Sequence, residues 1–311
     1  MRLVFDLRIL DDHFPGIARY GYELALALAR LPGGPELICV LPAAPRTRLD
    51  LAPLREAAAW VPSSAAVFGL GQHREIGALL RRLRPDAALF PYYVRPLWAP
   101  CPALTVIHDT ISWRAPESFA PATRLQIRLL HHLALARSAR VLTVSRSAAA
   151  DLAQFYSVDP RRITVTSEAA APQFAPPPPE RIAALRARHG LPARYVAYLA
   201  SDKPHKNIRL LLDAWARAET GDVGLVLGGR WFDPASEELL AAPGLAGRVW
   251  RLADVPEAEL PALYGGALAL AFPSRYEGFG LPAVEAMACG APVLAADRSS
   301  LPEVVGDAGL L

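Results

Sequence analysis

The chain has 311 residues, of which 52% are hydrophobic and 20% are charged, and its formal net charge at pH 7 is +3. This composition excludes an intrinsically disordered chain, and the length is typical of two domains. The small net charge gives no argument for nucleic-acid binding, so we expect no nucleic-acid partner.

The cysteines and the lengths of the apolar segments bear on where in the cell the protein is located. Cys39, Cys101 and Cys289 have apolar neighbours and no metal-ligand spacing, which favours buried free thiols in a reducing environment. The N-terminal strand reaches Asp6 too early for a signal peptide, and no apolar run is long enough to span a bilayer. We therefore expect a cytoplasmic protein, at most peripheral at the inner face of the membrane.

In the first half of the chain, short apolar strands alternate with helical patterns. The strand candidates are 3–7, 37–41, 66–68, 87–90, 103–107, 141–144 and 163–165. Helical periodicity fits 17–29, 76–83, 121–137 and 147–156, whereas 42–64 has no clear period and stays unassigned. This alternation predicts a parallel α/β architecture.

Residues 171–179 read APQFAPPPP, which predicts a stiff extended linker, because proline can neither continue a helix nor join a central strand. Beyond it the alternation resumes, with strands predicted at 195–199, 223–227, 249–252, 267–271 and 293–295. The predicted helices there are 180–188, 208–218, 235–240, 257–264 and 282–289. The fold prediction is therefore two Rossmann-like domains, 1–170 and 180–311, facing across a ligand-binding cleft.

Two carboxylates stand eight residues apart in the segment EGFGLPAVE, at Glu277 and Glu285. Proline is favoured at the first helical position, so Pro282 predicts that a helix over 282–289 begins there, with Gly290 after its end. This places Glu277 and Gly278–Gly280 in a loop and Glu285 in the first helical turn. A helix start favours phosphate and a carboxylate accepts from sugar hydroxyls, so the segment would suit a nucleotide sugar. The alternative is a plain strand–turn–helix with a solvated glutamate at each end.

The segment SDKPHKN, residues 201–207, contains both lysines of the chain, Lys203 and Lys206. It follows a predicted strand and precedes an apolar stripe at helical spacing, which predicts that Lys206 and Asn207 lie at a helix N-terminus. A lysine and free N–H groups there would neutralise a diphosphate. The alternative is a solvated lysine beside an ordinary helix cap.

Two candidates lie in the first domain. His108 and Asp109 end a predicted strand, where a neutral histidine next to a carboxylate can orient a hydroxyl or transfer a proton. Gly16 stands between the first strand and the first helix, where glycine lets the backbone approach a ligand. A structural His-Asp pair and a simple turn glycine are the alternatives.

The stretch 118–150 contains arginines and histidines but not one acidic residue. A basic helix of this kind would allow weak peripheral contact with an anionic membrane, although a solvated basic face explains the pattern equally. No Asp-x-Asp triplet follows a strand and no cluster has metal-ligand spacing, so the sequence predicts no metal and no other cofactor.

The run from Phe272 to Leu294, FPSRYEGFGLPAVEAMACGAPVL, resembles the C-terminal signature of the retaining GT-B glycosyltransferases of the large "group 1" (family 4) type. The PHKN tetrapeptide resembles the diphosphate-binding motif of that family. The His108-Asp109 pair, followed by Pro116-Glu117, resembles its first-domain motif. These versions of the motifs are most similar to the branch rich in mannosyltransferases.

The resemblance implies metal-independent transfer of a hexose from a nucleoside-diphosphate sugar to a hydroxyl acceptor, with retention at the anomeric carbon, in polysaccharide or glycolipid biosynthesis. GDP-mannose is the leading donor, UDP-linked sugars stay open, and the acceptor would be a glycan or a lipid-linked sugar. The alternatives are a nucleotide-sugar epimerase or sugar phosphorylase of related fold, or a non-catalytic sugar-binding partner.

By the same resemblance, His108 and Glu277 are the catalytic candidates. His108 would place the reacting hydroxyls, and Glu277 with the Gly278–Gly280 backbone would hold the donor sugar. Glu285 would bind the ribose. The donor-binding candidates are Gly16, Lys206, Asn207, Val255, Gly278, Phe279, Gly280, Leu281 and Glu285.

The chain departs from the family pattern in three places. Many relatives carry an arginine just ahead of the diphosphate-binding lysine, and here Lys203 or Arg230 would replace it. Residues 167–170 stand where many relatives have Asn-Gly. Relatives also continue through more helices after the last strand, so we expect a truncated C-terminal domain in this chain.

Overall fold

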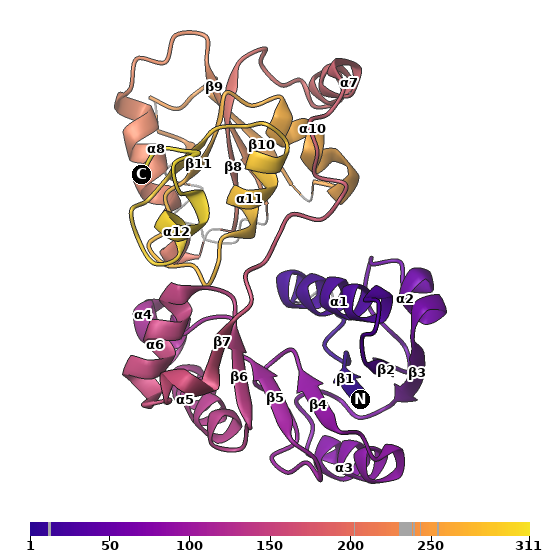
Figure 1. The fold of residues 1–311 in the computed structure, drawn as a ribbon. Helices are drawn as coiled ribbons and strands as arrows, with labels where there is room; N and C mark the ends of the chain where they lie inside the picture. The colour runs from indigo at the N-terminus through magenta and orange to yellow at the C-terminus, as the bar shows by residue number, and fades with distance from the viewer. Residues whose placement is uncertain (12–13, 202, 230–237, 239, 243, 254) are drawn as a thin grey trace. The chain divides into compact units, whose positions relative to one another are not determined.

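The computed structural model describes residues 1–311 apart from 12–13, 202, 230–237, 239, 243 and 254. The chain divides into two compact units. Unit 1 comprises Met1–Ser112 and Ala120–Ser167, and unit 2 comprises Trp113–Phe119 and Glu168–Leu311. Each unit has its own parallel β-sheet flanked by helices (Figure 1). The predicted α/β fold with two Rossmann-like domains is confirmed.

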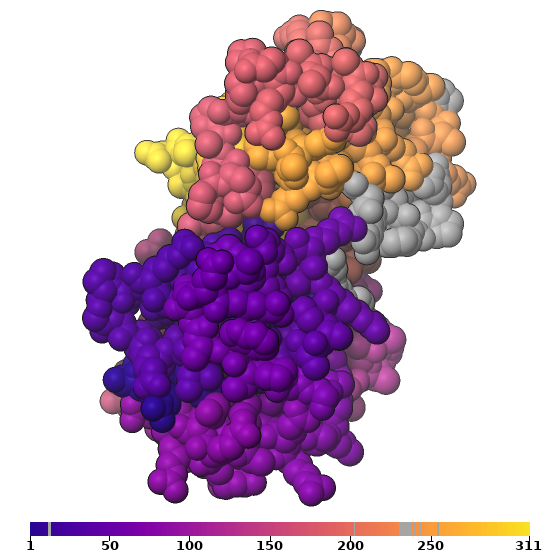
Figure 2. Space-filling model, turned by 90° about the vertical axis from the view of Figure 1, so that its right-hand side faces the viewer, coloured from indigo at the N-terminus to yellow at the C-terminus, as the bar shows by residue number. Residues whose placement is uncertain are grey.

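Unit 1 contains a seven-stranded sheet in the order β3-β2-β1-β4-β5-β6-β7. The strands are β1 (Arg2–Asp6), β2 (Glu36–Pro42), β3 (Ala59–Ser63), β4 (Ala87–Phe90), β5 (Ala103–Val106), β6 (Arg140–Thr143) and β7 (Ile163–Val165). The helices are α1 (Pro15–Arg30), α2 (Ala52–Ala57), α3 (Gly71–Leu83), α5 (Pro121–Ala136) and α6 (Arg146–Tyr156), and the short helix α4 (Ile111–Arg114) begins in unit 1 and ends in unit 2. In Figure 2 the visible face of unit 1 is covered mostly by indigo and violet segments, which belong to the first third of the chain.

The core of unit 1 forms on both faces of its sheet, as the continuous apolar runs in the strands predict. Alternate residues of the central strands point to opposite faces. Phe5 and Cys39 pack with α1 and α2, whereas Val4 and Val40 pack with α3. Phe5 stands opposite Cys39 on β2 and opposite Leu89 on β4, so the register places like residues on one face.

Unit 2 contains a five-stranded sheet in the order β10-β9-β8-β11-β12. Its strands are β8 (Tyr195–Leu199), β9 (Gly224–Gly228), β10 (Val249–Leu252), β11 (Ala269–Phe272) and β12 (Val293–Ala295). Its helices are α7 (Pro179–His189), α8 (Ile208–Arg217), α10 (Leu260–Gly265), α11 (Leu281–Ala288) and α12 (Leu301–Val305). Single 3₁₀ turns lie at η1 (Pro116–Ser118), η3 (Pro204–Lys206) and η4 (Glu257–Glu259) in this unit and at η2 (Pro160–Arg162) in unit 1.

Two core clusters cover the two faces of this second sheet. Helix α8 packs Leu212 and Trp215 against one face, and α7, α10 and α11 pack against the other (Figure 1). Ala171 and Phe174, from the proline-rich segment, are also buried in the second cluster, where the Phe174 ring lies 6.2 Å from that of Tyr264. The proline-rich segment is thus partly packed onto unit 2.

The predicted strand at 66–68 is wrong. The strand is instead β3 (Ala59–Ser63), inside the stretch without a clear period. β3 pairs only with β2 at the sheet edge, where a proline such as Pro62 is tolerated and a side chain such as Trp60 is 43% exposed. An edge strand therefore lacks the apolar signal of the central strands. Val67 packs as a loop residue, and Phe68 is mostly exposed.

The remaining element predictions agree with the structure to within a few residues, with two qualifications. The predicted helix 235–240 falls largely outside the described residues. The predicted helix 257–264 is the 3₁₀ turn η4 followed by α10. No helix in the described part of the chain is both long and apolar enough to cross a membrane.

Candidate functional site

The loop between β11 and α11 carries the most distinctive residues of the sequence. Its last residue, Gly280, has φ of 114°, a backbone conformation that is open to glycine and strained for other residues. A Cβ atom at this position would also lie only 2.9 Å from Cδ2 of Leu301. Gly280 therefore has to be glycine, and it turns the chain from the loop into α11.

The start of α11 corrects one prediction. The helix begins at Leu281, with Pro282 as its second residue, and ends at Ala288. Glu285 is thus the fifth residue of the helix and lies in its second turn, not its first. Because the left-handed Gly280 ends the loop, the helix begins at Leu281, one residue earlier than Pro282. The preference of proline for the first helical position does not by itself reveal this shift.

Lys206 and Glu277 form an ion pair in unit 2. The Lys206 ammonium donates to both carboxylate oxygens of Glu277, at 2.7 Å from Oε1 and 2.9 Å from Oε2. The two side chains are only 20% and 12% exposed, and the ammonium also lies 5.9 Å from the centre of the Phe272 ring. The structure therefore brings together the lysine of PHKN and the first glutamate of EGFGLPAVE, which are 71 residues apart in the sequence.

Glu285 points into the interior of unit 2. It is 9% exposed, and its Oε2 accepts a hydrogen bond from the hydroxyl of the fully buried Tyr264 at 3.0 Å. Burial, together with the Glu285 carboxylate, raises the pKa of Tyr264 well above its ordinary value, so the phenol stays a donor. Burial and the same carboxylate raise the pKa of Cys289 to about 11, so this thiol is unreactive at neutral pH. Tyr264 thus fixes the orientation of the carboxylate.

The PHKN segment is tied to the loop after β11 by hydrogen bonds from both sides. Asn207 has φ of 58° and donates from its side chain to the Pro273 carbonyl at 3.1 Å. The Arg275 backbone donates to the His205 carbonyl at 2.8 Å, and its guanidinium donates to the Pro204 carbonyl at 3.0 Å. Lys206 ends the turn η3, and Asn207 separates it from the first residue of α8, so both lie at the start of this helix as predicted.

His205, the second residue of PHKN, is buried. Its Nδ1 lies 3.0 Å from the Ser118 hydroxyl, and the neighbouring Glu117 accepts from the Arg275 guanidinium at 2.8 Å. Burial, and then the nearby positive charges led by Lys206, lower the pKa of His205 to about 3. His205 is therefore neutral at physiological pH and serves as a structural support of the lysine loop.

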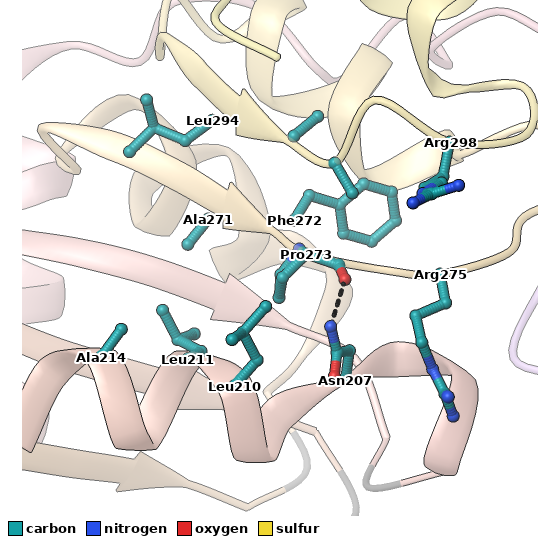
Figure 3. A pocket seen from close by; sticks show the side chains of 12 residues that line it. Asn207, Leu210, Leu211, Ala214, Ala271, Phe272, Pro273, Arg275, Leu294 and Arg298 are labelled. Atoms are coloured by element: carbon teal, nitrogen blue, oxygen red, sulfur yellow. Dashed lines mark hydrogen bonds between the residues drawn. The ribbon is translucent and has the colours of Figure 1, made fainter.

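A cavity of about 760 Å³ opens beside this segment, between α8 on one side and β11 and β12 on the other (Figure 3). Its walls are apolar, and Asn207, Arg275 and Arg298 stand at one end, near the Asn207–Pro273 hydrogen bond. Neither Lys206 nor either glutamate lines this cavity. The ion pair and the cavity are therefore separate features of unit 2.

The remaining donor-site candidates are less informative. Val255 is half-buried against the core of unit 2, and a Cβ on Gly228 would lie 3.5 Å from its Cγ2. Lys203 is exposed, whereas Arg230 lies outside the described residues. The Lys203 carbonyl accepts from the Lys206 backbone N–H at 2.9 Å, but no described contact brings the Lys203 ammonium to that of Lys206. In the part of the chain that the structure describes, no three His, Cys, Asp or Glu side chains are grouped to hold a metal ion.

His108 and Gly16 belong to unit 1. His108 follows β5, its Nε2 lies 2.9 Å from the Pro91 carbonyl, and its ring packs edge-on against that of Tyr20 with centroids 4.8 Å apart. Gly16 is exposed in the first turn of α1, and a Cβ there would meet no atom within 4 Å. Among the described residues no contact requires glycine at this position, and approach by a ligand stays a prediction.

Sequence reasoning missed three residues that hold the site. They are Tyr264, which donates to Glu285, and Ser299 and Ser300, which bond the backbone of Glu277 and Phe279. Tyr264 ends a predicted helix and the serines follow a predicted strand, so their places were known. Only the tertiary structure shows what they contact, because the partners lie more than 20 residues away.

Comparison with known proteins gives two family matches that together cover most of the chain. "Glycosyltransferase Family 4" matches residues 15–169, and "Glycosyl transferases group 1" matches residues 183–310. O-antigen chain mannosyltransferase B of Escherichia coli is 34% identical over 216 residues, 67% of this chain and 56% of the relative. MMP α-(1→4)-mannosyltransferase of Mycolicibacterium hassiacum is 35% identical over 172 residues, 54% of this chain and 39% of the relative. The chain spans about half the length of these curated relatives.

The fold is also similar to that of solved structures. HepE of Anabaena, in complex with UDP-glucose, superposes with a TM-score of 0.71 over 97% of this chain and 82% of its own, at 22% identity. At that identity the likeness shows the fold alone. With one family model on the first half and its companion on the second, this chain belongs to the group 1 (family 4) glycosyltransferases.

Proposed function

We propose that this chain transfers mannose from GDP-mannose to a hydroxyl acceptor, with retention at the anomeric carbon, in the synthesis of a polysaccharide or glycolipid. The observation that carries the proposal is the buried ion pair of Lys206 with Glu277 in unit 2, next to the helix on which Tyr264 fixes the carboxylate of Glu285. The curated relatives named as mannosyltransferases favour mannose as the sugar. Family membership supports transfer of a glycosyl group as the reaction.

Lys206 would bind the diphosphate. An ammonium carries three N–H donors, and two of them are directed at the Glu277 carboxylate, which leaves the third for a phosphate oxygen. The developing negative charge on the departing diphosphate would be stabilised by this cation and by the free N–H groups at the start of α8 and α11. Asn207, fixed to Pro273, would hold the start of α8 in place.

Glu277 and Glu285 would bind the two ends of the donor. Glu285 would accept hydrogen bonds from the ribose hydroxyls, with Tyr264 fixing one of its oxygens. Glu277 is held beside the lysine and would accept from hydroxyls of the sugar, together with the backbone of Gly278–Gly280. Bound in this way, the sugar would lie next to the diphosphate, with its anomeric carbon at the junction. Val255 would contact the base.

The residues of unit 1 would supply the acceptor side. His108, with its Nε2 at 2.9 Å from the Pro91 carbonyl, would orient the reacting hydroxyl, and Gly16 would let the backbone approach the ligand. The acceptor would be a glycan or a lipid-linked sugar. The transfer would need no metal, because the cation and the helix starts supply the positive charge.

A thermal-shift screen over GDP-, UDP- and ADP-sugars tests the donor site. We expect wild type to be stabilised by one nucleotide class, with the shift abolished in Glu285→Ala. Glu180→Ala is the matched control, because Glu180 is an exposed glutamate at the start of α7 in the same unit. Equal shifts in wild type and Glu285→Ala would contradict the ribose assignment.

Release of free GDP from GDP-mannose, measured with and without an added α-mannoside, tests the reaction. Transfer requires that GDP release depend on the acceptor. Acceptor-independent conversion of the sugar without GDP release would instead indicate an epimerase.

A further inference from the structure

Three consecutive residues after β12 contact the loop that follows β11. The 299–301 segment is Ser299, Ser300 and Leu301, and the 277–280 loop is Glu277–Gly280. The Ser299 hydroxyl oxygen accepts from the Glu277 backbone N–H at 2.9 Å. The Ser300 hydroxyl lies 2.6 Å from the Phe279 carbonyl and 3.1 Å from the Glu277 carbonyl, as donor. Leu301 packs against Gly280, where an added Cβ would lie 2.9 Å from its Cδ2.

Ser300 makes these bonds in place of its usual local one. It is the residue before α12, where a serine side chain ordinarily accepts from an N–H of the first helical turn. Here the side chain makes no capping hydrogen bond, is fully buried, and points to the 277–280 loop instead. The hydroxyl is therefore directed by the tertiary contact and not by the helix that it precedes.

Ser299 also departs from its local preference. Its φ is 51°, in the left-handed region that residues other than glycine, asparagine and aspartate rarely adopt. In this conformation its side chain reaches the Glu277 N–H. A strained backbone conformation persists only where surrounding contacts hold it, and such residues are common at functional sites. Ser300 thus lacks its usual capping hydrogen bond and Ser299 has an unfavourable backbone conformation, and both side chains bond to the 277–280 loop.

We infer that the 299–301 segment positions the 277–280 loop for the sugar of the nucleotide-sugar donor, an inference that rests on the proposed function. The backbone N–H of Glu277 is hydrogen-bonded to Ser299 and its carbonyl to Ser300. These two bonds hold the Glu277 backbone in the position from which its carboxylate reaches Lys206. Glu285, which would bind the ribose, is held by Tyr264 on another element. The serines therefore act on the sugar and not on the nucleotide.

The test compares the binding of GDP and GDP-mannose by calorimetry in wild type and Ser300→Ala, with UDP and UDP-glucose as the pair if wild type prefers uridine. We expect Ser300→Ala to weaken the binding of GDP-mannose about tenfold and to change that of GDP about twofold at most, because the loop would contact the sugar directly and acts on the diphosphate only indirectly, through Lys206 and α11. Ser299→Gly, which keeps the backbone conformation but removes the hydroxyl, should act in the same direction.

Ser138→Ala is the matched control. The Ser138 hydroxyl is also buried and also donates to a backbone carbonyl, that of Ala134 at 2.7 Å, but in unit 1. It should lower stability without changing the ratio of the two dissociation constants. In a Glu277→Gln background, Ser300→Ala should no longer change the ratio, because the serine acts through Glu277.

Hydrogen–deuterium exchange without ligand gives a readout that does not depend on donor identity. Peptides covering 275–281 should exchange faster in Ser300→Ala than in wild type. If GDP and GDP-mannose weaken equally in Ser300→Ala, or neither weakens, the inference is wrong while the proposed function stands. If wild type binds no nucleotide or nucleotide sugar, the proposed function fails, and this positioning role fails with it.

Discussion

The ammonium of Lys206 donates to both carboxylate oxygens of Glu277, at 2.7 and 2.9 Å, so the cation that we propose binds the phosphate is already paired with an anion. Each group is more than three-quarters buried, which strengthens their mutual attraction relative to an exposed pair. A diphosphate that approaches Lys206 therefore meets a negative charge beside the positive one. The Glu277 carboxylate therefore weakens binding of the diphosphate, and we expect it to compensate by binding the sugar.

Glu277→Gln should separate these two effects. We expect about fivefold tighter binding of GDP, because the repulsion of the diphosphate is removed while the amide can still accept from Lys206. Turnover of GDP-mannose should fall about 100-fold, because the sugar loses a charged partner. Calorimetry and initial rates measure the two quantities.

Lys206→Met is the companion variant to Glu277→Gln, and it should lose GDP binding. Weaker GDP binding in Glu277→Gln would mean that Glu277 contacts the nucleotide itself and that the sugar assignment is wrong.

Tyr264→Phe should weaken GDP and GDP-mannose to the same extent, by about tenfold. The variant removes only the hydroxyl that fixes Oε2 of Glu285, and a hydrogen bond to a charged acceptor contributes about 1.5–3 kcal/mol. Since both ligands carry the same ribose, the ratio of their dissociation constants should not change. This equal loss distinguishes Tyr264 from Ser300. A loss confined to GDP-mannose would place Glu285 at the sugar and not at the ribose.

Acid should destabilise unit 2 through His205, which is 4% exposed. Burial and neighbouring cations lower its folded pKa to about 3, below the value of about 6.5 in the unfolded chain. Protonation then favours the unfolded state, so this contribution to stability is complete above pH 6.5 and is lost progressively as the pH falls toward 3. At pH 5 the loss from this group amounts to about 2 kcal/mol.

Urea unfolding of wild type and His205→Gln at pH 7 and pH 5 measures this loss. The variant should lose less stability between the two pH values than wild type. His131 in unit 1 is also fully buried, with a pKa lowered to about 3, and remains in both proteins as an internal reference. Identical pH dependence in the two proteins would show that His205 is not buried in neutral form.

Arg8→Ala should destabilise unit 1 by about 3–5 kcal/mol. The Arg8 guanidinium is buried, lies 2.6 Å from Oδ2 of Asp6, and also donates to the Ala65 carbonyl and to Gln72. Its removal leaves the Asp6 carboxylate buried without its countercharge. Urea denaturation measures the change.

Arg161→Ala is the control for Arg8→Ala, because Arg161 pairs with Asp159 on the surface and is 91% exposed. It should leave the urea midpoint nearly unchanged. A similar loss in both variants would mean that the burial of the Arg8–Asp6 pair has no energetic consequence.

The fold class and the segments that carry the candidate site could be predicted from the amino-acid sequence. The central strands are continuously apolar because both faces of a parallel sheet are covered, and this made β8, β11 and their neighbours visible without a structure. Gly280 and Pro282 predicted a loop-to-helix turn, since few residues other than glycine adopt the backbone conformation of Gly280 and proline favours the first turn of a helix. The edge strand β3 was not predicted, because its side chains are partly exposed and it contains Pro62, so it has no continuous apolar run.

The contacts between side chains could not be predicted from the sequence and come from the folded structure. The pairing of Lys206 with Glu277, the hydroxyl of Tyr264 on Glu285, and the serines behind Glu277 all join segments that are 21 to 71 residues apart. Local spacing places such residues on helices or loops, but their contacts depend on strand order: β8 and β11 are neighbours in the sheet although β9 and β10 separate them in the chain. Long-range contacts of this kind have no local signature, because they arise from packing and not from backbone preference.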